Sequence, residues 1–321
     1  SKKNSYTNAW HNQFYSLVTT KIDEDIFEPL FPEGKKSGRP NASIRILVAM
    51  SVLKEGFGCS DEDLFEKCEF DLLTRKALGL ELLTDVTPSI DTYYLFRRRI
   101  CEYQERTGID LMQLCFEQLA GNHVHLLKIS GKCVRMDSKL IGSNIARQSR
   151  YELIHTTLVK FLKTCTLSDL SPEKEERAKE YLKEDSSKTV YRSDSDTLQS
   201  NLARIGNFIM EMLAAFPTTS PAHDLLQRLF DEQYVIMDGK AVLRDKKEVK
   251  ADSLQNPNDP DATYRAKNDQ KVQGYVTNIT ETVEEGKPSI ITSVQVETAV
   301  FADCHFLQEA VENSERVTDS T

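Results

Sequence analysis

The stretch from Lys132 to Ile141 carries an aspartate in a setting where it could bind a metal ion. The stretch is apolar and partly β-branched, and glycines flank it, which is the pattern of a strand bounded by turns. Alternation places Asp137 on the opposite face from Met136 and Ser138. With apolar residues on both sides of it, we expect its carboxylate at the edge or mouth of a sheet rather than on an open surface. There it either coordinates a hard cation or pairs with a base, because an isolated buried charge is unstable.

A structural role for Asp137 is the alternative. Arg135 and Lys139 lie on the same predicted face, and an ion pair with either would explain the carboxylate without a metal. The residue alone leaves both interpretations open. A helical segment precedes this strand and a strand-rich segment follows much later, and this order favours the first interpretation only through the family resemblance described below.

Basic side chains gather in two clusters in the first third of the chain, although the net charge of −9 is unusual for a nucleic-acid-binding protein. Phosphate contacts depend on such local clusters rather than on total charge. The clusters are Lys35, Lys36, Arg39 and Arg45, and Arg97, Arg98 and Arg99. Adjacent helical residues point about 100° apart, so we expect at least one of the three consecutive arginines to brace the domain. The others either contact phosphate or form a solvated helix end.

The chain is long enough for two or three domains. Its 321 residues are 39% hydrophobic and 28% charged, as in a globular protein. No apolar run is long enough for a membrane helix, so no membrane partner is expected. Seven scattered cysteines without a Cys-x-x-Cys pair predict neither a disulfide framework nor a zinc site, and they favour a reducing cytoplasm.

Hydrophobic periodicity divides the chain into helical and strand-rich parts. Residues 1–130 are predicted as helices, with boundaries near Ile44–Lys54, Ser60–Cys68, Asp71–Leu78, Ser89–Ile100 and Asp110–Leu127. Residues 145–250 are predicted as a helical insertion that includes helices near Asn201–Phe216 and Ala222–Val235, with Tyr181–Asp196 as loop. Residues 253–267 are predicted as a polar loop, followed by strands Gln273–Val283 and Ser289–Val300 and a helix Ala302–Asn313. The insertion could hold DNA or a second subunit, and its charge runs could equally be a solvated face.

Three phrases in the helical part recur in a known family. Gly38-Arg39-Pro40 comes first, Gly56, Gly58 and Ser60 follow an apolar helix, and Ser89, Thr92, Phe96 and Arg97 come last. In this order and spacing they resemble the N-terminal helical domain of InsH-type transposases. The strand Arg135-Met136-Asp137-Ser138 and the later Asp259-Pro260-Asp261-Ala262 and Gly274-Tyr275 are similar to the catalytic core of DDE transposases of bacterial insertion sequences.

The resemblance implies an α+β protein: an N-terminal all-helical domain (residues 1–130), which binds DNA or mediates assembly, and an incomplete ribonuclease H-like α/β core (residues 131–321) carrying the helical insertion. It further implies metal-dependent DNA cleavage and strand transfer at the ends of an insertion sequence. Two Mg²⁺ or Mn²⁺ ions would be held by three acids in the complete protein. The implied partners are terminal-repeat DNA, target DNA and further copies of the chain, in a bacterial cytoplasm near the nucleoid. Lys267 or Arg265 could meet a phosphate there or simply brace the loop.

Asp137 supplies the first of those acids, as catalytic residue and metal ligand. Asp319 is a weak candidate for the second, because it lacks the preceding apolar strand, and no Glu stands where the third is expected. We therefore expect a chain that is truncated and inactive alone. The alternative is a helical DNA-binding or assembly protein with an inactive ribonuclease H-like remnant, which needs no metal. An unrelated nuclease with an α+β core is a third possibility.

Overall fold

The computed structural model describes residues 8–31, 42–82, 84–217, 220–267 and 270–319, and these form an α+β protein. Two compact units share the chain. The first comprises residues 1–136, 279–294 and 308–321, and the second comprises residues 137–278 and 295–307. The division into domains at residue 130, which the sequence predicts, stays a prediction.

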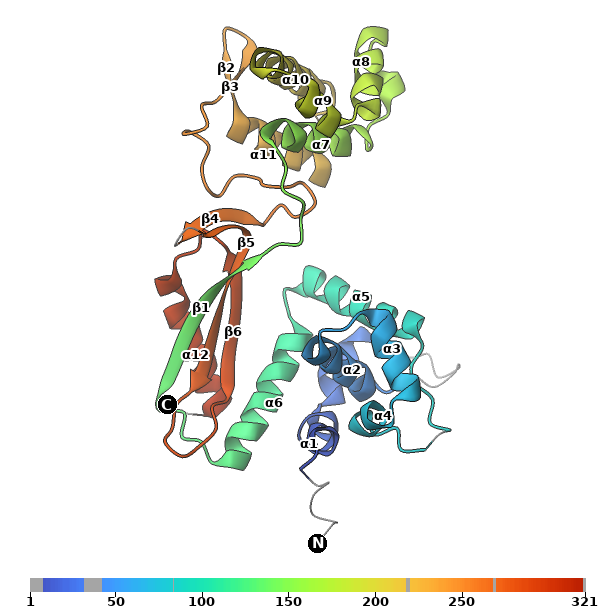
Figure 1. Cartoon of the computed structure of the whole chain (residues 1–321), viewed down its shortest axis with the longest axis vertical. Helices are drawn as coiled ribbons and strands as arrows, with labels where there is room; N and C mark the ends of the chain where they lie inside the picture. Colours follow the sequence, from blue (N-terminus) through green and yellow to red (C-terminus); the bar gives the residue numbers. More distant parts are fainter. Residues whose placement is uncertain (1–7, 32–41, 83, 218–219, 268–269, 320–321) are drawn as a thin grey trace. The chain divides into compact units, whose positions relative to one another are not determined.

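The first unit begins with a helical bundle (Figure 1, blue to cyan). Its helices are α1 (Trp10–Leu17), η2 (Thr19–Lys21), η3 (Glu24–Leu30), α2 (Ile44–Phe57), α3 (Asp61–Phe70), α4 (Leu72–Leu78), α5 (Ile90–Thr107) and α6 (Leu111–Leu127). The predicted helices of residues 1–130 are thus confirmed for the described residues. Polar caps fix several of these boundaries, because a side-chain oxygen satisfies free amides of the first turn. Asp71 caps α4 and Asp110 caps α6 in this way.

Apolar side chains from these helices form one core. Phe27, Met50, Leu64 and Tyr93 are each at most 1% exposed, and they come from η3, α2, α3 and α5 respectively. Burial of such large side chains stabilises each by about 1.5–3 kcal/mol relative to exposure. The bundle is therefore held by its own core and can present side chains on its surface at fixed positions.

A four-stranded sheet comes after the bundle in the chain. Its strands are β1 (Val134–Gly142), β4 (Thr263–Lys267), β5 (Gln270–Thr282) and β6 (Ile291–Thr298). The order is β1-β5-β4, and β6 also pairs with β5. The amide of Ser143 donates to the carbonyl of Gln273 and the amide of Val283 to that of Cys133, both at 2.8 Å, so β1 runs antiparallel to β5.

The β4–β5 pair is also antiparallel, with Thr263 opposite Gly274. The predicted hairpin of β5 and β6 is confirmed. The prediction of residues 253–267 as loop was wrong for its last five residues, which form β4.

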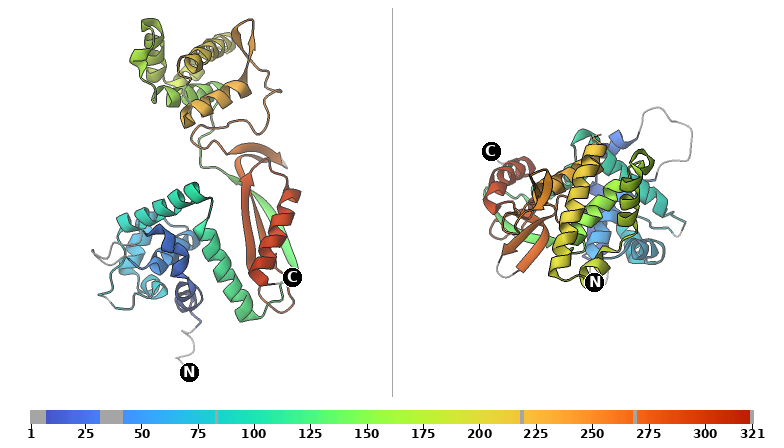
Figure 2. Two further views of the ribbon diagram at one scale, coloured as in Figure 1. Left: turned by 180° about the vertical axis from the view of Figure 1, so that it is seen from behind. Right: turned by 90° about the horizontal axis from the view of Figure 1, so that it is seen from above.

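After β6 the chain continues into η5 (Asp303–Phe306) and α12 (Leu307–Thr318), which lies along the sheet (Figure 2). The contact between α12 and β6 is unusually polar. Thr292 Oγ1 lies 2.7 Å from Ser314 Oγ, and Asn313 donates to Ser293 Oγ at 3.0 Å. All four residues are buried. Because each buried polar group has a partner, the contact avoids the penalty of unpaired groups and fixes the helix at one position along the strand.

The helical insertion makes up most of the second unit. It consists of α7 (Arg150–Leu162), η4 (Leu167–Asp169), α8 (Pro172–Lys183), α9 (Ser186–Arg192), α10 (Ser195–Ala215), α11 (Pro221–Gln233), β2 (Tyr234–Met237) and β3 (Lys240–Leu243). It has a core of its own, with Ile154, Phe208 and Leu226 fully buried. The prediction of Tyr181–Asp196 as loop was wrong for most of its residues, because the segment contains the end of α8, the whole of α9 and the start of α10. The β2–β3 hairpin was not predicted at all.

Candidate nucleic-acid interface

The junction between α2 and α3 places Asp61 at the first position of α3. Gly58 ends α2 with φ of 60°, a conformation that glycine adopts without strain. Ser60 then caps α3, since its hydroxyl accepts from the amide of Asp63 at 3.1 Å and the Asp63 carboxylate accepts from the amide of Ser60 at 3.3 Å. Hydrogen bonding of the Asp63 carboxylate to the Ser60 side chain, and then to the Ser60 amide, lowers the pKa of Asp63. The short turn therefore sets the direction in which Asp61 points.

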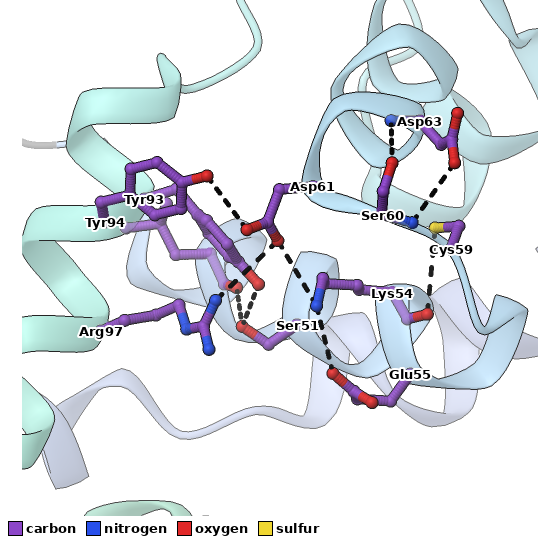
Figure 3. A network of polar contacts seen from close by, with 11 residues as sticks. Ser51, Lys54, Glu55, Cys59, Ser60, Asp61, Asp63, Tyr93, Tyr94 and Arg97 are labelled. Atoms are coloured by element: carbon purple, nitrogen blue, oxygen red, sulfur yellow. Dashed lines mark hydrogen bonds and ion pairs between the residues drawn. The ribbon is translucent and has the colours of Figure 1, made fainter. Parts of the chain in front are cut away.

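Asp61 is the centre of a polar network that joins α2, α3 and α5 (Figure 3). Tyr94 donates its hydroxyl to Asp61 Oδ2 at 3.0 Å. Lys54 Nζ and Arg97 Nη1 lie 3.4 Å and 3.8 Å from Asp61 Oδ1. The carboxylate raises the pKa of Lys54 by its charge and raises the pKa of Tyr94 by accepting its hydrogen bond. One carboxylate thus holds two cations and a phenol together.

Arg97 is held from a second side by an aromatic ring. Its guanidinium carbon lies 5.7 Å from the centre of the Tyr93 ring, within the range of a cation–π contact. Tyr93 is 1% exposed, and its hydroxyl accepts from Ser51 at 3.2 Å, so the ring is fixed in the core. The Arg97 side chain remains 50% exposed. It is a positioned cation with half of its surface free for an external anion.

The other two arginines of this run contact different partners, as predicted from helix geometry. Arg98 is 67% exposed, and its Nε lies 3.6 Å from Glu102 Oε1 one turn along α5. The guanidinium carbon of Arg99 lies 5.4 Å from the centre of the Phe31 ring, and the side chain is partly buried. Arg99 therefore braces the bundle, whereas Arg97 and Arg98 face outward.

The first basic cluster is only partly within the described structure. Lys35, Lys36 and Arg39 lie outside the described residues. Arg45 lies at the start of α2, where its Nε donates to the carbonyl of Ile22 at 3.3 Å and its amide donates to Glu24 Oε1 at 2.8 Å. This side chain therefore braces the contact between α2 and the segment before it.

Asp137 lies in the middle of β1, which is at one edge of the sheet. The edge position agrees with the prediction, but the expectation that the carboxylate would not lie on an open surface was wrong. The carboxylate is exposed, although apolar residues flank it in sequence, and it makes no hydrogen bond or ion pair with any described residue. The candidate partner Arg135 instead donates to Glu281 Oε1 at 2.6 Å. The edge strand thus leaves Asp137 free to bind a ligand without disturbing the fold.

Within the described ranges, no group of three or more His, Cys, Asp or Glu residues is placed to hold a metal ion. Asp137 alone does not make up a magnesium site. Asp319, the weak candidate for a second acid, follows α12, and its Oδ2 lies 3.1 Å from His125 Nε2 of α6. These residues therefore do not by themselves fit a two-metal centre.

Asp259, in the second region of resemblance, fastens the loop before β4 to the sheet. Its carboxylate accepts from the hydroxyls of Ser143 and Tyr275. Burial, together with this hydrogen bond, raises the pKa of Tyr275 to about 12. Arg265 donates to the carbonyls of Ala299 and Phe301, so it is a brace; the side chain of Lys267 is not described.

Sequence reasoning missed Lys54, Asp61 and Tyr94 as parts of the site around Arg97. The available signal was the acidic start of α3 after the turn at Gly58, which indicated only a helix cap. Nothing in the spacing showed that α5 would bring Arg97 to that cap, because the contact links positions 36 residues apart in the chain (97 minus 61).

None of the helices in the described part of the chain is long and apolar enough to cross a membrane. Residues 5–99 match the family model of a transposase domain, DUF772. This match supports a transposase family for the N-terminal part of the chain. No curated protein and no solved structure matches the sequence.

Proposed function

We propose that the protein acts in the transposition of an insertion sequence and that its N-terminal helical domain binds the DNA of the element ends. The observation that carries this proposal is the match of residues 5–99 to a transposase domain, which covers α1 to most of α5 and therefore the whole network around Asp61. The DNA-binding side chains would be Arg97 and Arg98, with Lys35, Lys36 and Arg39 adding charge from the same domain.

The local geometry supports a phosphate contact at Arg97. A flexible exposed arginine loses rotamer freedom when it binds, which weakens the interaction. Arg97 is already restrained by Asp61 and by the Tyr93 ring, so less freedom remains to be lost. The N–H groups of its guanidinium can form paired hydrogen bonds with phosphate oxygens. Such contacts fix the position of the protein on the DNA and do not read the base sequence. The negative total charge is weaker evidence against this contact than it first looks, since phosphate binding depends on individual local cations.

We further propose that β1, β5, β6 and α12 are the first elements of a ribonuclease H-like core of the DDE type. The antiparallel order of the three strands, followed by a helix on the sheet, supports this. In that arrangement Asp137 is the first metal-binding acid. Mg²⁺ in such a centre would activate the attacking oxygen and stabilise the leaving one. The acids of this chain named above do not complete the centre, so no step of cleavage is assigned to them.

DNA binding by the intact chain tests the proposal. Labelled duplex would be titrated at about 50 mM and about 200 mM salt, with the Arg97→Ala and Arg98→Ala variants beside the natural chain. Each variant should lower affinity and reduce the salt slope by about 0.9 for each phosphate that the variant no longer neutralises. Arg106→Ala is the matched control. It removes the same charge from the last turn of the same helix, where Arg106 stacks on Tyr103.

Equal effects of Arg97→Ala and Arg106→Ala would show that Arg97 contributes only general charge. An intact chain that binds no duplex at either salt concentration would remove the DNA-binding role and leave a helical assembly module. A working complex of several copies is part of the proposal as well, and sedimentation of the chain with and without duplex would measure it.

A further inference from the structure

An open cavity of about 520 Å³ lies beside the start of α7, between the helical insertion and the segment that leads into β4. The residues lining it come from α7, the end of α11, β4 and the segment between β3 and β4: Arg150, Leu153, Gln233, Lys246, Val249, Lys250, Ala251, Ser253, Leu254, Gln255 and Tyr264. This set holds three cationic side chains and no carboxylate. In a chain with a net charge of −9, that composition sets the cavity apart.

Arg150 is the most constrained of the three cations. It is partly buried, and its Nε donates to Gln233 Oε1 at 2.7 Å while Nη2 reaches the Gln233 carbonyl at 3.4 Å. Gln233 is 3% exposed, so the guanidinium is held by a fixed and neutral partner. Among the described residues no carboxylate lies within ion-pair distance of it. Burial lowers the pKa of Arg150, because the cation has lost part of its hydration, and the charge of Asp245 offsets this shift only in part.

Carboxylates near the cavity are engaged with other groups. Asp245 accepts from the amide of Lys247 at 2.9 Å, and Glu248 accepts from the amide of Asp245 at 3.1 Å. Glu232 accepts from Arg228 at 2.8 Å and from the amide of Leu254 at 2.7 Å. None of these three carboxylates forms an ion pair with Arg150. A partly buried cation without an ionic partner favours binding of an anion from solution, which would replace the lost hydration.

The remaining walls suit a flat, weakly polar group. Leu153, Val249 and Leu254 supply apolar surface, and Tyr264 supplies an aromatic ring. Aromatic side chains bind nucleic-acid bases by stacking. The volume far exceeds that of a single small anion, since a water molecule takes about 30 Å³. The lining therefore combines cationic side chains with apolar surface, a composition that matches an anion joined to a ring.

We propose that this cavity binds a nucleoside phosphate, with the phosphate at Arg150 and Lys250 and the base against Tyr264 and Val249. The nucleotide is either free in solution or a unit of a DNA strand. The proposal concerns the helical insertion, and only the DNA-strand case shares a ligand with the function proposed above.

Calorimetric titration of the intact chain tests it, with three probes: deoxyadenosine monophosphate, deoxyadenosine without phosphate, and single-stranded DNA of about eight nucleotides. Binding should require the phosphate. Arg150→Gln should weaken it about tenfold, the effect of one charge-assisted hydrogen bond, and Lys250→Gln should weaken it several-fold. Arg192→Gln is the control, because it removes an exposed charge from the same insertion outside the cavity lining. Lys250 is exposed, so its variant stays informative even where Arg150→Gln disturbs the fold.

If the mononucleotide binds, and if Arg150→Gln and Lys250→Gln both weaken that binding, the ligand is a free nucleotide. Binding of the oligonucleotide alone, again weakened by both, supports a strand. The proposal is overturned if neither phosphate probe binds. It is also overturned if Lys250→Gln and Arg192→Gln change the binding equally. Duplex binding through Arg97 is measured separately, so each proposal can fail without the other.

Discussion

Arg97 on α5 and Asp61 at the start of α3 face each other, with Nη1 and Oδ1 3.8 Å apart, and Lys54 of α2 shares the same carboxylate oxygen at 3.4 Å. A single acid thus ties three helices together at the point where the bundle shows its positioned cation. The same residue lies in the first turn of α3, where a negative charge also interacts favourably with the helix dipole. Asp61 therefore both supports the bundle and positions Arg97, the candidate DNA contact.

Asp61→Asn should destabilise the chain more than Glu62→Gln does. Both changes remove a first-turn acid of α3, an interaction of about 0.3–1 kcal/mol. Only Asp61 also pairs with Lys54 and Arg97, contacts that solvent screens and that each add a small further stabilisation. Urea unfolding of the two variants measures the difference. Equal free energies of unfolding would mean that the network around Asp61 contributes nothing beyond the helix dipole.

Gly274 of β5 cannot carry a side chain without moving β1. An added Cβ would collide with the carbonyl oxygen of Ile141 and would lie 2.5 Å from the amide nitrogen of Ser143. Backbone atoms of a paired strand do not yield as a flexible side chain does. Gly274→Ala should therefore lower the free energy of unfolding by about 1–3 kcal/mol.

Gly142→Ala is the control for this change, because an added Cβ at Gly142 meets nothing within 4 Å. Its effect on the free energy of unfolding in urea should stay within about 0.5 kcal/mol. A loss of stability as large as that of Gly274→Ala would show that alanine is poorly tolerated anywhere in this strand pair and that the close approach is not the cause.

Local signals predicted most of the fold. The helices of residues 1–130 follow from caps such as Ser60 and Ser89 and from apolar spacing, and both signals act over a few residues. The recurring phrases of the sequence now have a physical basis as well. Gly58 and Ser60 form the turn between α2 and α3, and Gly274 permits the approach of β1.

The errors have two causes. Asp238-Gly239 joins β2 and β3 as a two-residue hairpin loop, with φ of 50° and 75°. This dipeptide is a strong hairpin signal, but it lies within a segment that was predicted to be helical. In contrast, β4 had no local signal. Thr263–Lys267 is short and polar, and it is a strand because β5 offers it a free edge. Such pairing depends on distant residues and is invisible in a short window.

The same distinction applies to the candidate site. Helix geometry was enough to predict that Arg97, Arg98 and Arg99 diverge. It also offers Glu102, four residues along the same helix, as a neighbour of Arg98. It could not identify Asp61 and Phe31 as partners of Arg97 and Arg99, since they lie on other segments. The exposure of Asp137 was missed for a similar reason: flanking apolar residues indicate burial only where another layer covers that face of the strand.

Asp137→Asn should leave stability almost unchanged, while Asp259→Asn should not. Asp137 is exposed and has no partner among the described residues, so the change should stay within about 0.5 kcal/mol. Asp259 accepts hydroxyl hydrogen bonds from Ser143 and Tyr275, and loss of this acceptor should cost about 1–3 kcal/mol. Urea unfolding of both variants checks the contrast. A destabilised Asp137→Asn would assign that carboxylate to the fold and weaken its proposed role as a metal ligand.

Glu284, in the turn between β5 and β6, should make stability depend on pH in the acid range. Its carboxylate lies 2.6 Å from Lys287 Nζ and accepts from the amide of Ser130 at 2.7 Å, and these bonds lower its pKa from the usual 4.5 to about 2. The folded state thus favours the charged form, so the stabilisation is complete above about pH 4.5 and disappears as the pH falls towards 2. Glu284→Gln should therefore unfold at a lower urea midpoint than the unmutated chain at pH 6, and at the same midpoint near pH 2. Glu285→Gln is the control, because Glu285 is an exposed neighbour, and its midpoint should show no such pH-dependent difference. A Glu284→Gln deficit that stayed constant across this range would mean that the turn is held by the shape of the side chain and not by its charge.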